Sequence, residues 1–420
     1  MATQQHVKAD ATHNFYGLGI APAILEVLER LNFKVPTPIQ TQAIPVAIQG
    51  GDVVGIAQTG TGKTLAYGIP LVQHLARVQG HGLIIVPTRE LALQVDESIR
   101  KICMPLGLRT AVLIGGASSQ PQVQALRRNP HVLIVTPGRL IDHLTQKNLR
   151  LTHVSILILD EADRMLDMGF LPQIQRILSV LPKERQTMLF SATMPAEIMK
   201  IAAAHMKLPT RVEIAPPGTM ADRVTQELFI VSRDKKQDLL TKLLEKYQGP
   251  TLVFARTKYG AQKIALAIRT SGIRSAEIHS NRSLSQRREA LDGFKSGRYR
   301  VLVATDIASR GIDVIGIELV LNYDLPANSE DYVHRIGRTA RAGAGGHAIT
   351  FAMPSEGREV RTIERLVRKE LPVVTLPTLT DISMPSFPRP AQKTYQRGPR
   401  RGARSSGGRF QQRQTFRKRS

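Results

Sequence analysis

The chain has 420 residues, 42% of them hydrophobic and 22% charged, which suits a soluble globular protein of two or three domains at roughly 100–200 residues each. It carries 58 Lys and Arg against 34 Asp and Glu, and the net charge of +24 points to nucleic acid first and an anionic membrane surface second. A single cysteine, Cys103, excludes an intrachain disulfide and a multi-cysteine zinc site. The first residues lack a secretory signal and no apolar run reaches about 18 residues, so we expect a cytoplasmic protein without a transmembrane helix.

Short apolar runs rich in Val, Ile and Leu recur along the chain, separated by amphipathic stretches. In the first half they cover residues 52–57, 82–87, 131–136, 155–160 and 186–191. In the second half they cover residues 250–255, 299–304, 318–322 and 347–352. This alternation predicts buried parallel strands with helical crossovers, and therefore a doubly wound α/β fold.

Two changes of composition divide the chain. Residues 215–222 carry two prolines and a glycine without an apolar run, which predicts a linker. After about Leu371 the sequence turns proline-rich and then rich in Arg, Gly, Ser and Gln, and such a segment buries too little apolar surface to fold. We therefore expect a first domain over residues 1–215, a linker over 216–222, a second domain over 223–371 and a disordered basic tail over 372–420.

A glycine-rich segment follows the first apolar run. Residues 57–64 read AQTGTGKT, the phosphate-binding loop pattern with Ala57 in place of the first glycine. Gly60 and Gly62 permit a tight backbone whose N–H groups surround phosphate oxygens. Lys63 would neutralise the β- and γ-phosphates and the Thr64 hydroxyl would ligate Mg²⁺. The residues expected to bind the nucleotide here are Ala57, Gln58, Thr59, Gly60, Thr61, Gly62, Lys63 and Thr64.

An acidic segment ends the apolar run at residues 155–160. Residues 160–163 read DEAD, and alone they could be a charged turn that caps a helix. Downstream of a phosphate-binding loop, an acid at this place is expected to hold Mg²⁺, directly or through water, opposite the threonine. We assign that role to Asp160, and the orientation of the attacking water to Glu161.

These segments form an ordered series that resembles the DEAD-box ATP-dependent RNA helicases over about residues 15–345. The motif LDMGF (166–170) and the tail resemble those of the bacterial RhlE-type subgroup. The resemblance implies two RecA-like domains, ATP hydrolysis stimulated by RNA, and separation of short RNA duplexes or remodelling of RNA–protein complexes. The matching segments are Phe15, FKVPTPIQ (33–40), AQTGTGKT (57–64), PTREL (87–91), Gly115-Gly116, TPGRL (136–140), DEAD (160–163), SAT (191–193), LVFARTK (252–258), ATDIASRGID (304–313) and YVHRIGRTARAG (332–343).

The resemblance also implies roles for single residues. For ATP, Phe33 would pack on the adenine, Gln40 would hydrogen-bond its polar edge, and Asp313 would contact the ribose, with Phe15 as a further contact. Arg338 and Arg341 would reach the γ-phosphate as arginine fingers. The residues expected to couple the ATP and RNA sites are Asp163, Ser191, Thr193, His334 and Arg335, with His334 and Arg335 bridging to the DEAD and SAT segments.

RNA would be recognised through its backbone rather than its base sequence, since small residues beside arginines suit phosphate and 2′-OH contacts. The residues implied are Arg89, Gly116, Thr136, Arg139 and Thr305. The last 39 residues hold 11 basic residues and no acidic one. They interleave arginines with Phe410 and Phe416, which favours auxiliary RNA binding over a merely solubilising end.

Three residues depart from the family pattern: Asn32 and Ser280 replace glycines, and Leu284 replaces a glutamine. No catalytic residue is lost, and we assign no role to Ser280 or Leu284. An ATP-gated RNA clamp with little unwinding would need the same motifs and stays open, whereas the PTPIQ and DEAD wording disfavours a DNA translocase. We expect a monomer acting on single-stranded and short duplex RNA, with ribosomal precursor particles or RNA-decay proteins as partners and no membrane contact.

Overall fold

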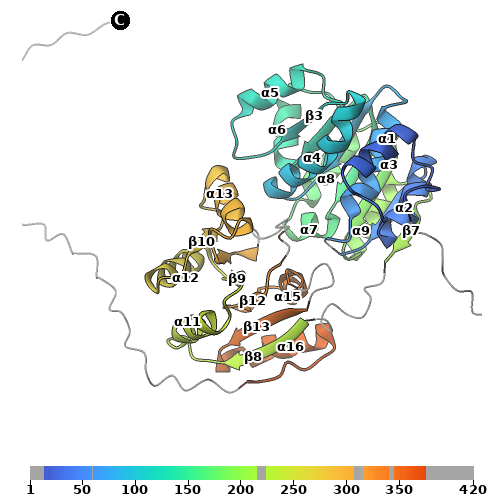
Figure 1. Ribbon diagram of the computed structural model, residues 1–420. Coiled ribbons are helices and arrows are strands. Elements are labelled where there is room, and N and C mark those ends of the chain that lie inside the picture. Colours follow the sequence, from blue (N-terminus) through green and yellow to red (C-terminus); the bar gives the residue numbers. More distant parts are fainter. Residues whose placement is uncertain are drawn as a thin grey trace, which may run out of the picture. The chain divides into compact units, whose positions relative to one another are not determined.

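The computed structural model describes residues 14–58, 60–214, 224–306, 314, 316–339 and 345–374. Its strands form two separate parallel sheets, one in each half of the chain (Figure 1). The predicted α/β class with doubly wound parallel sheets is therefore confirmed. Within the described residues, no helix is both long and apolar enough to cross a lipid bilayer.

The first sheet has seven strands in the order β3-β4-β2-β5-β6-β1-β7, and all its neighbouring pairs run parallel. The strands are β1 (Val53–Ile56), β2 (His81–Ile85), β3 (Thr110–Leu113), β4 (Val132–Val135), β5 (Val154–Asp160), β6 (Gln186–Ser191) and β7 (Thr210–Glu213). The helices of this half are α1 (Pro22–Arg30), α2 (Pro38–Ile48), α3 (Lys63–Leu75), α4 (Arg89–Cys103), α5 (Ser119–Arg127), α6 (Pro137–Thr145), α7 (Ala162–Asp167), α8 (Leu171–Val180) and α9 (Ala196–His205), with a 3₁₀ turn at Met104–Leu106.

Successive side chains of each inner strand enter opposite cores, because a strand alternates its side chains between the two faces of a sheet. In β5, Ile156 and Ile158 pack with α1 to α4 on one face. Leu157 and Leu159 pack with α6 to α9 on the other. An unbroken apolar run is therefore what a strand covered on both faces requires.

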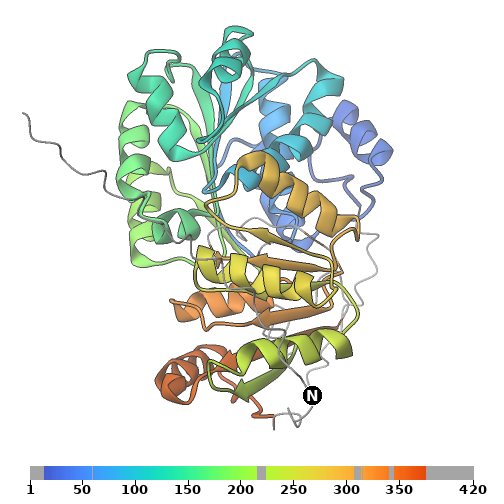
Figure 2. The same cartoon turned by 90° about the vertical axis from the view of Figure 1, so that its left-hand side faces the viewer.

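The second sheet has six strands in the order β10-β11-β9-β12-β13-β8, again with all pairs parallel. The helices α11 and α12 cover one of its faces (Figure 2), and α13, α15 and α16 cover the other. The strands are β8 (Val224–Ile230), β9 (Thr251–Phe254), β10 (Ser275–Ile278), β11 (Val301–Ala304), β12 (Leu319–Asn322) and β13 (Gly346–Ala352). The helices are α11 (Lys236–Lys246), α12 (Lys258–Thr270), α13 (Leu284–Lys295), α15 (Ser329–Ile336) and α16 (Gly357–Val367), with a 3₁₀ turn at Pro354–Glu356.

Every apolar run predicted from the sequence contains or overlaps a strand, but four strands were not predicted. They are the outermost strands of the two sheets, β3 and β7 in the first and β8 and β10 in the second. An outer strand has a partner on one side only and tolerates polar residues. β7, for example, reads TRVE and buries only its valine.

The expected linker at residues 216–222 and nearly all of the expected tail lie outside the described residues. The first residues assigned to the tail are described, and they run beside β8. The amide of Leu228 donates to the carbonyl of Pro372 at 2.9 Å, and the amide of Val374 donates to the carbonyl of Leu228 at 2.9 Å. Leu228 and Val373 form a parallel bridge.

Candidate active site

Most predicted ATP-binding and RNA-binding residues of the first half follow strand ends along one edge of its sheet, whereas Phe15, Phe33 and Gln40 precede β1. In a parallel sheet all carboxyl ends share an edge, and ligands bind there. The phosphate-binding loop (57–64) follows β1, the DEAD segment (160–163) begins at the end of β5, and the SAT segment (191–193) begins at the end of β6. We call these segments the ATP set, and their strands are adjacent in the order β5-β6-β1. Arg89 follows β2, Gly116 follows β3, and Thr136 and Arg139 follow β4. We call these residues the RNA set, and their strands are adjacent in the order β3-β4-β2. Since β2 pairs with β5, the two sets meet at that pair.

The phosphate-binding loop connects β1 to α3 in a backbone conformation that needs glycine. Gly60 and Gly62 have φ of 87° and 90°, a region that L side chains rarely adopt. A Cβ on Gly62 would also lie 2.4 Å from Nε2 of Gln40. The buried Lys63 donates from Nζ to the carbonyl of Ala57 at 2.9 Å, so the lysine ammonium lies within the loop.

Two further loop residues were predicted to bind the nucleotide. The Thr61 hydroxyl donates to the carbonyl of Gln58 at 2.7 Å, which closes a turn inside the loop. Thr59 lies outside the described residues.

Gln40 joins the start of α2 to this loop. Its Oε1 accepts from the amide of Thr37 at 2.9 Å, and its Nε2 donates to the carbonyl of Gly62 at 3.0 Å. The side chain is buried. In this arrangement the amide holds the loop, and its predicted contact with the adenine edge remains a prediction.

The two predicted aromatic contacts of the adenine differ in burial. Phe33 is 41% exposed, as a ring that stacks on a ligand must be, whereas Phe15 is buried in the hydrophobic core. Both rings line one hollow of about 290 Å³ together with Tyr16 and Glu29. Phe15 therefore lies behind the hollow as part of the core, and Phe33 is the ring available to a base.

Asp160 ends β5 as a buried carboxylate beside Lys63. Burial raises its pKa to about 6, and the charge of Glu161 adds to this rise while Lys63 opposes it. The hydroxyl of Tyr67 donates to Oδ2 of Asp160 at 2.9 Å and also lies within hydrogen-bonding reach of Thr64. A buried carboxylate that accepts a hydrogen bond from Tyr67 thus faces the end of the phosphate-binding loop.

This donor set suits Mg²⁺. A carboxylate and a hydroxyl are the hard oxygen donors that the ion prefers, and Mg²⁺ is commonly bound through one or two carboxylates together with substrate phosphates. Among the described residues no group of three or more His, Cys, Asp or Glu could enclose a metal. Asp160 and Thr64 supply donors that fit a Mg²⁺ ion whose other ligands come from the nucleotide phosphates.

Glu161 has an unusual backbone conformation. Its φ of 54° lies in the left-handed region, which costs a non-glycine residue of order 1–3 kcal/mol and persists where the surroundings fix it. Oε2 of Glu161 pairs with Nη1 of Arg164 at 3.1 Å, and both side chains are almost fully buried. Burial would raise the pKa of Glu161, but Arg164, Lys63 and Arg338 outweigh it and the pKa is lowered. Glu161 is therefore charged at neutral pH and suited to orienting water rather than to carrying a proton.

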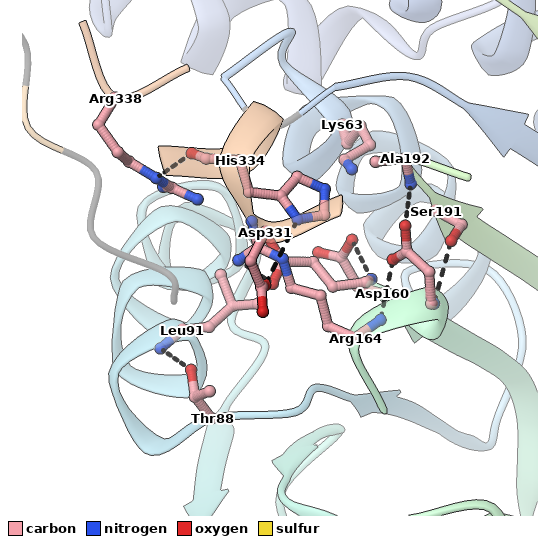
Figure 3. A network of polar contacts seen from close by, with 12 residues as sticks. Lys63, Thr88, Leu91, Asp160, Arg164, Ser191, Ala192, Asp331, His334 and Arg338 are labelled. Atoms are coloured by element: carbon pink, nitrogen blue, oxygen red, sulfur yellow. Dashed lines mark hydrogen bonds and ion pairs between the residues drawn. The ribbon is translucent and has the colours of Figure 1, made fainter. Parts of the chain in front are cut away.

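Asp163 ties the DEAD segment to the SAT segment. Its Oδ2 accepts from the amides of Ala192 and Thr193 at 3.1 and 2.8 Å and from the Thr193 hydroxyl at 3.0 Å. Its own amide donates to the Ser191 hydroxyl at 3.1 Å. The predicted coupling residues Ser191 and Thr193 are thus each hydrogen-bonded to Asp163. Figure 3 shows Ser191 and Ala192 of this network in one view with Asp160 and Arg164.

Residues of α15 and the turn after it lie near this cluster. His334 lines a hollow of about 130 Å³ together with Asp163 and Thr193. The buried Arg338 donates from Nε to the carbonyl of His334 at 3.3 Å, and its charge contributes to the lowered pKa of Glu161. His334 thus lies beside the predicted coupling residues and the charge of Arg338 acts on Glu161, while their roles in coupling and as an arginine finger remain predictions. Arg341 and Asp313 lie outside the described residues.

Arg335 differs from the expectation that it bridges to the DEAD and SAT segments. Its Nη2 donates to Asp306 at 2.8 Å, and its Nη1 donates to Asn322 at 3.2 Å and to the carbonyl of Asp324 at 2.6 Å. Its guanidinium also lies 4.9 Å from the ring centroid of Phe254. All these groups belong to the second sheet and its loops, so these contacts make Arg335 an internal brace of the second half.

The predicted RNA residues of the first half form a second cluster on the edge. A Cβ on Gly116 would lie 1.9 Å from Nη1 of Arg89, so the guanidinium occupies the space that only glycine leaves. Arg139 donates from Nη2 to the carbonyl of Ala117 at 3.0 Å. Its Nε lies 3.6 Å from Oδ2 of Asp142 in an ion pair. Its Nη1 is buried and has no hydrogen-bond partner among the described residues, which leaves this donor for an anion. Thr136 is buried at the start of α6.

Two residues of the catalytic cluster, Tyr67 and Arg164, were missed by the sequence reasoning. A signal for both exists in helical spacing, since residues three or four apart share a face. Tyr67 lies four residues after Lys63 in α3, and Arg164 lies three residues after Glu161.

Comparison with known proteins gives two family matches. Residues 37–201 match the DEAD/DEAH box helicase family and residues 235–343 match the helicase conserved C-terminal domain. The DEAD-box ATP-dependent RNA helicase CshA of Geobacillus kaustophilus is 43% identical, over 87% of this chain and 79% of that protein. The ATP-dependent rRNA helicase RRP3 of Debaryomyces hansenii is 40% identical, over 86% of this chain and 76% of that protein.

Solved structures resemble the chain over a similar length. Saccharomyces cerevisiae Dbp5 bound to RNA and ADP BeF3 matches with a TM-score of 0.76 and 28% identity, over 87% of this chain and 96% of that one. Mss116p bound to ssRNA and AMP-PNP matches with a TM-score of 0.77 and 26% identity, over 85% of this chain and 78% of that one.

Proposed function

The chain belongs to the DEAD-box ATP-dependent RNA helicases, and from this premise we propose how it works. ATP hydrolysis stimulated by RNA drives local separation of short RNA duplexes or remodelling of RNA–protein complexes. One observation carries the proposal. The edge of the first sheet is divided between an ATP set on β5-β6-β1 and an RNA set on β3-β4-β2, so the two ligands would bind side by side on one rigid element.

The ATP site acts by positioning and by charge. Lys63 and the loop amides bind the phosphates, Thr64 and Asp160 hold Mg²⁺, and Glu161 orients the attacking water. Mg²⁺ neutralises charge on the phosphate oxygens when it is bound. Arg338 and Arg341 stabilise the charge that develops in the transition state, a contribution of ~10³–10⁵ in turnover for such arginines.

The bonds of Asp163 support coupling between the two ligands. A shift of the DEAD segment on ATP binding would be transmitted to residues 191–193 through the bonds between Asp163 and the amides of Ala192 and Thr193. Ligands that favour the closed arrangement of the two domains shift the population toward it. Hydrolysis and phosphate release then reverse the shift.

RNA is recognised through its backbone in this proposal. Arg89, Gly116, Thr136 and Arg139 of the first half, and Thr305 of the second, offer cations, backbone amides and two hydroxyls that suit phosphate and 2′-OH groups. The basic residues after Asp381 would add contacts that carry no sequence preference.

The cellular setting belongs to the same proposal. We place a monomer in the cytoplasm, acting on ribosomal precursor particles or together with RNA-decay proteins, and the rRNA helicase among the relatives supports the first of these. Membership of the RhlE-type subgroup remains a prediction, because the relatives named above are CshA and RRP3.

The test is steady-state ATP hydrolysis without nucleic acid, with single-stranded RNA, and with DNA of the same sequence. Stimulation by RNA alone, followed by release of a short duplex, is the expected result. Equal stimulation by DNA would contradict RNA specificity and favour a DNA translocase. Stimulation by RNA with long RNA residence and no duplex release would replace unwinding by an ATP-gated clamp.

A further inference from the structure

Three neighbouring strands of the second sheet end in a polar group of residues. In the order β10-β11-β9, Asn281 follows β10, Thr305 follows β11 and Lys258 follows β9. Nζ of Lys258 donates to Oδ1 of Asn281 at 3.0 Å, which joins the loops on either side of β11. The amide of Thr305 donates to the carbonyl of Ile278 at 3.3 Å. The predicted RNA residue Thr305 thus lies between the two loops that this bond connects.

Tyr259 presents an aromatic ring to solvent beside this group. Its side chain is 68% exposed, and Nζ of Lys258 lies 5.2 Å from its ring centroid. The backbone here is held by the helix cap, since the Thr257 hydroxyl accepts from the amide of Gly260 at 3.0 Å. The core-facing residues of α12 include Ala261, Ile264, Ala265 and Ile268. Tyr259 therefore contributes little to the core, and the cap holds the backbone from which its side chain extends.

His279 is a buried polar side chain at the end of β10. It is 3% exposed, and neither ring nitrogen has a hydrogen-bond partner among the described residues. Burial lowers the pKa of His279, and the charges of Arg282, Arg287 and Lys258 lower it further against Glu277. Burial of two ring nitrogens without hydrogen-bond partners costs free energy. Because the imidazole is neutral and its surroundings are cationic, a ligand that could pair with these nitrogens would carry an anionic group or a hydroxyl.

We propose that Tyr259, Lys258 and His279 form a subsite for single-stranded RNA on the second half, in which Tyr259 stacks on a base. Lys258 neutralises a neighbouring phosphate and His279 hydrogen-bonds the backbone at a phosphate or a 2′-OH. The subsite rests on the proposed RNA-dependent function and deepens it. It adds to the backbone contacts a base contact that tolerates any sequence, since every base has a face on which an aromatic ring can stack.

The chemistry of the three side chains is that of a single-strand binding surface. Such surfaces combine cations that follow the backbone with aromatic rings on which bases stack. A paired base in a duplex has no free face, so a stack at Tyr259 would favour an unpaired strand. The subsite would thereby help to hold a strand that has been separated.

The experiment measures binding of the full chain to a fluorescent single-stranded RNA in the presence of AMP-PNP. It compares ordinary RNA with RNA of the same length that lacks bases. Tyr259→Ala should weaken binding of ordinary RNA about five-fold or more, because a base–aromatic stack contributes about 1–3 kcal/mol, and should leave abasic RNA unaffected. Tyr259→Phe keeps the ring and should bind like the parent. Leu266→Ala removes another exposed side chain of α12 and should also bind like the parent.

His279 has its own arm of the test. His279→Ala should weaken ordinary and abasic RNA equally, because its contact is with the backbone, and thermal unfolding checks that the variant is folded. An equal loss for Tyr259→Ala on both RNAs, or no loss on ordinary RNA, would overturn the stacking subsite. If the parent protein itself neither bound RNA nor hydrolysed ATP faster with it, the proposed function would fail. If the parent did both while Tyr259→Ala matched it, only the subsite would fail.

Discussion

The hydroxyl of Tyr67 donates a 2.9 Å hydrogen bond to Oδ2 of Asp160, and both side chains are buried. The bond joins α3, which begins at the phosphate-binding loop, to the end of β5. It therefore fixes the carboxylate proposed to hold Mg²⁺ relative to the loop proposed to hold the phosphates. A hydrogen bond to a charged group contributes about 1.5–3 kcal/mol, enough to set the orientation of the carboxylate.

Replacement of Tyr67 by Phe removes that bond while it keeps the ring and its volume. We expect kcat for ATP hydrolysis with RNA to fall about 10-fold, in line with about 1.5 kcal/mol of lost orientation, and the unfolding temperature to change little. Steady-state kinetics and thermal unfolding measure the two effects. An unchanged kcat would show that Asp160 is oriented without the tyrosine.

Lys63 and Glu161 should separate binding from turnover. Lys63→Ala removes the ammonium that lies in the phosphate-binding loop, so we expect it to lose ATP binding. Glu161→Gln keeps shape and backbone, so we expect near-parental ATP binding and a fall in turnover of about 10²–10⁴, the range for a residue that assists proton transfer or water attack. Fluorescent-nucleotide titration and phosphate release measure the two. Hydrolysis by Glu161→Gln at the parental rate would remove the water-orienting role.

Arg338→Ala tests the arginine finger. Because the guanidinium is proposed to act on transition-state charge, turnover with RNA should fall by ~10³–10⁵ while ATP still binds. The exposed Arg361 on α16 offers a matched control, and Arg361→Ala should keep parental turnover. A loss of ATP affinity as large as the loss of turnover would mean that Arg338 stabilises bound ATP as much as it stabilises the transition state.

Glu277 should make the stability of the second half depend on pH. Burial would raise its pKa, but hydrogen bonds from Arg269, at 2.7 Å, and from Arg282 outweigh it, and the pKa is lowered from its ordinary value of 4.5. A lowered pKa means that the carboxylate stabilises the fold above about pH 4.5, and that this contribution is lost as the pH falls through the folded-state pKa.

We therefore expect Glu277→Gln to lower the free energy of unfolding by about 1–3 kcal/mol at pH 7. The difference in the free energy of unfolding between Glu277→Gln and the parent should narrow as the pH falls below about 4.5. Denaturant unfolding at a series of pH values measures it. Glu184→Gln, which removes an exposed pair with Lys207, serves as the control and should change nothing measurable. A gap that widened toward acid would contradict the assignment.

Deletion of residues 382–420 removes 11 basic residues and no acidic one. If this segment binds RNA phosphates, affinity should fall and the dependence of log K on log salt should flatten. The slope should change by about 0.7 for each phosphate of a single strand that the shortened protein no longer neutralises. RNA titrations at several KCl concentrations give both slopes. Parallel slopes for the two proteins would leave the segment without a role in RNA binding.

The sequence predicts inner strands better than outer ones for a physical reason. Inner strands are covered on both faces and need a continuous apolar run, as ILIL (156–159) within β5 is. Outer strands carry polar or small residues because one side has no strand partner, as in SAEI of β10. A search for unbroken apolar runs therefore finds the middle of each sheet and passes over its borders.

The same contrast holds for the site. The phosphate-binding loop and residues 160–163 are local patterns, so the sequence reveals them directly. The bond between Tyr67 and Asp160 joins residues far apart in the chain, and no local pattern announces it. Arg335 was expected to bridge to the DEAD and SAT segments because the family resemblance implies that role. Its position three residues after the buried Tyr332 is the helical spacing that indicates an inward side chain.

The hydrogen bonds between Leu228 and residues 372–374 have a consequence for self-association. β8 is the last strand of its sheet, and a bare strand edge offers N–H and C=O groups on which another chain can pair. The residues that lead into the basic segment occupy part of that edge. The chain thus covers part of its own sheet edge, which protects it from edge-to-edge aggregation. A shortened protein keeps this protection only if it ends beyond Val374.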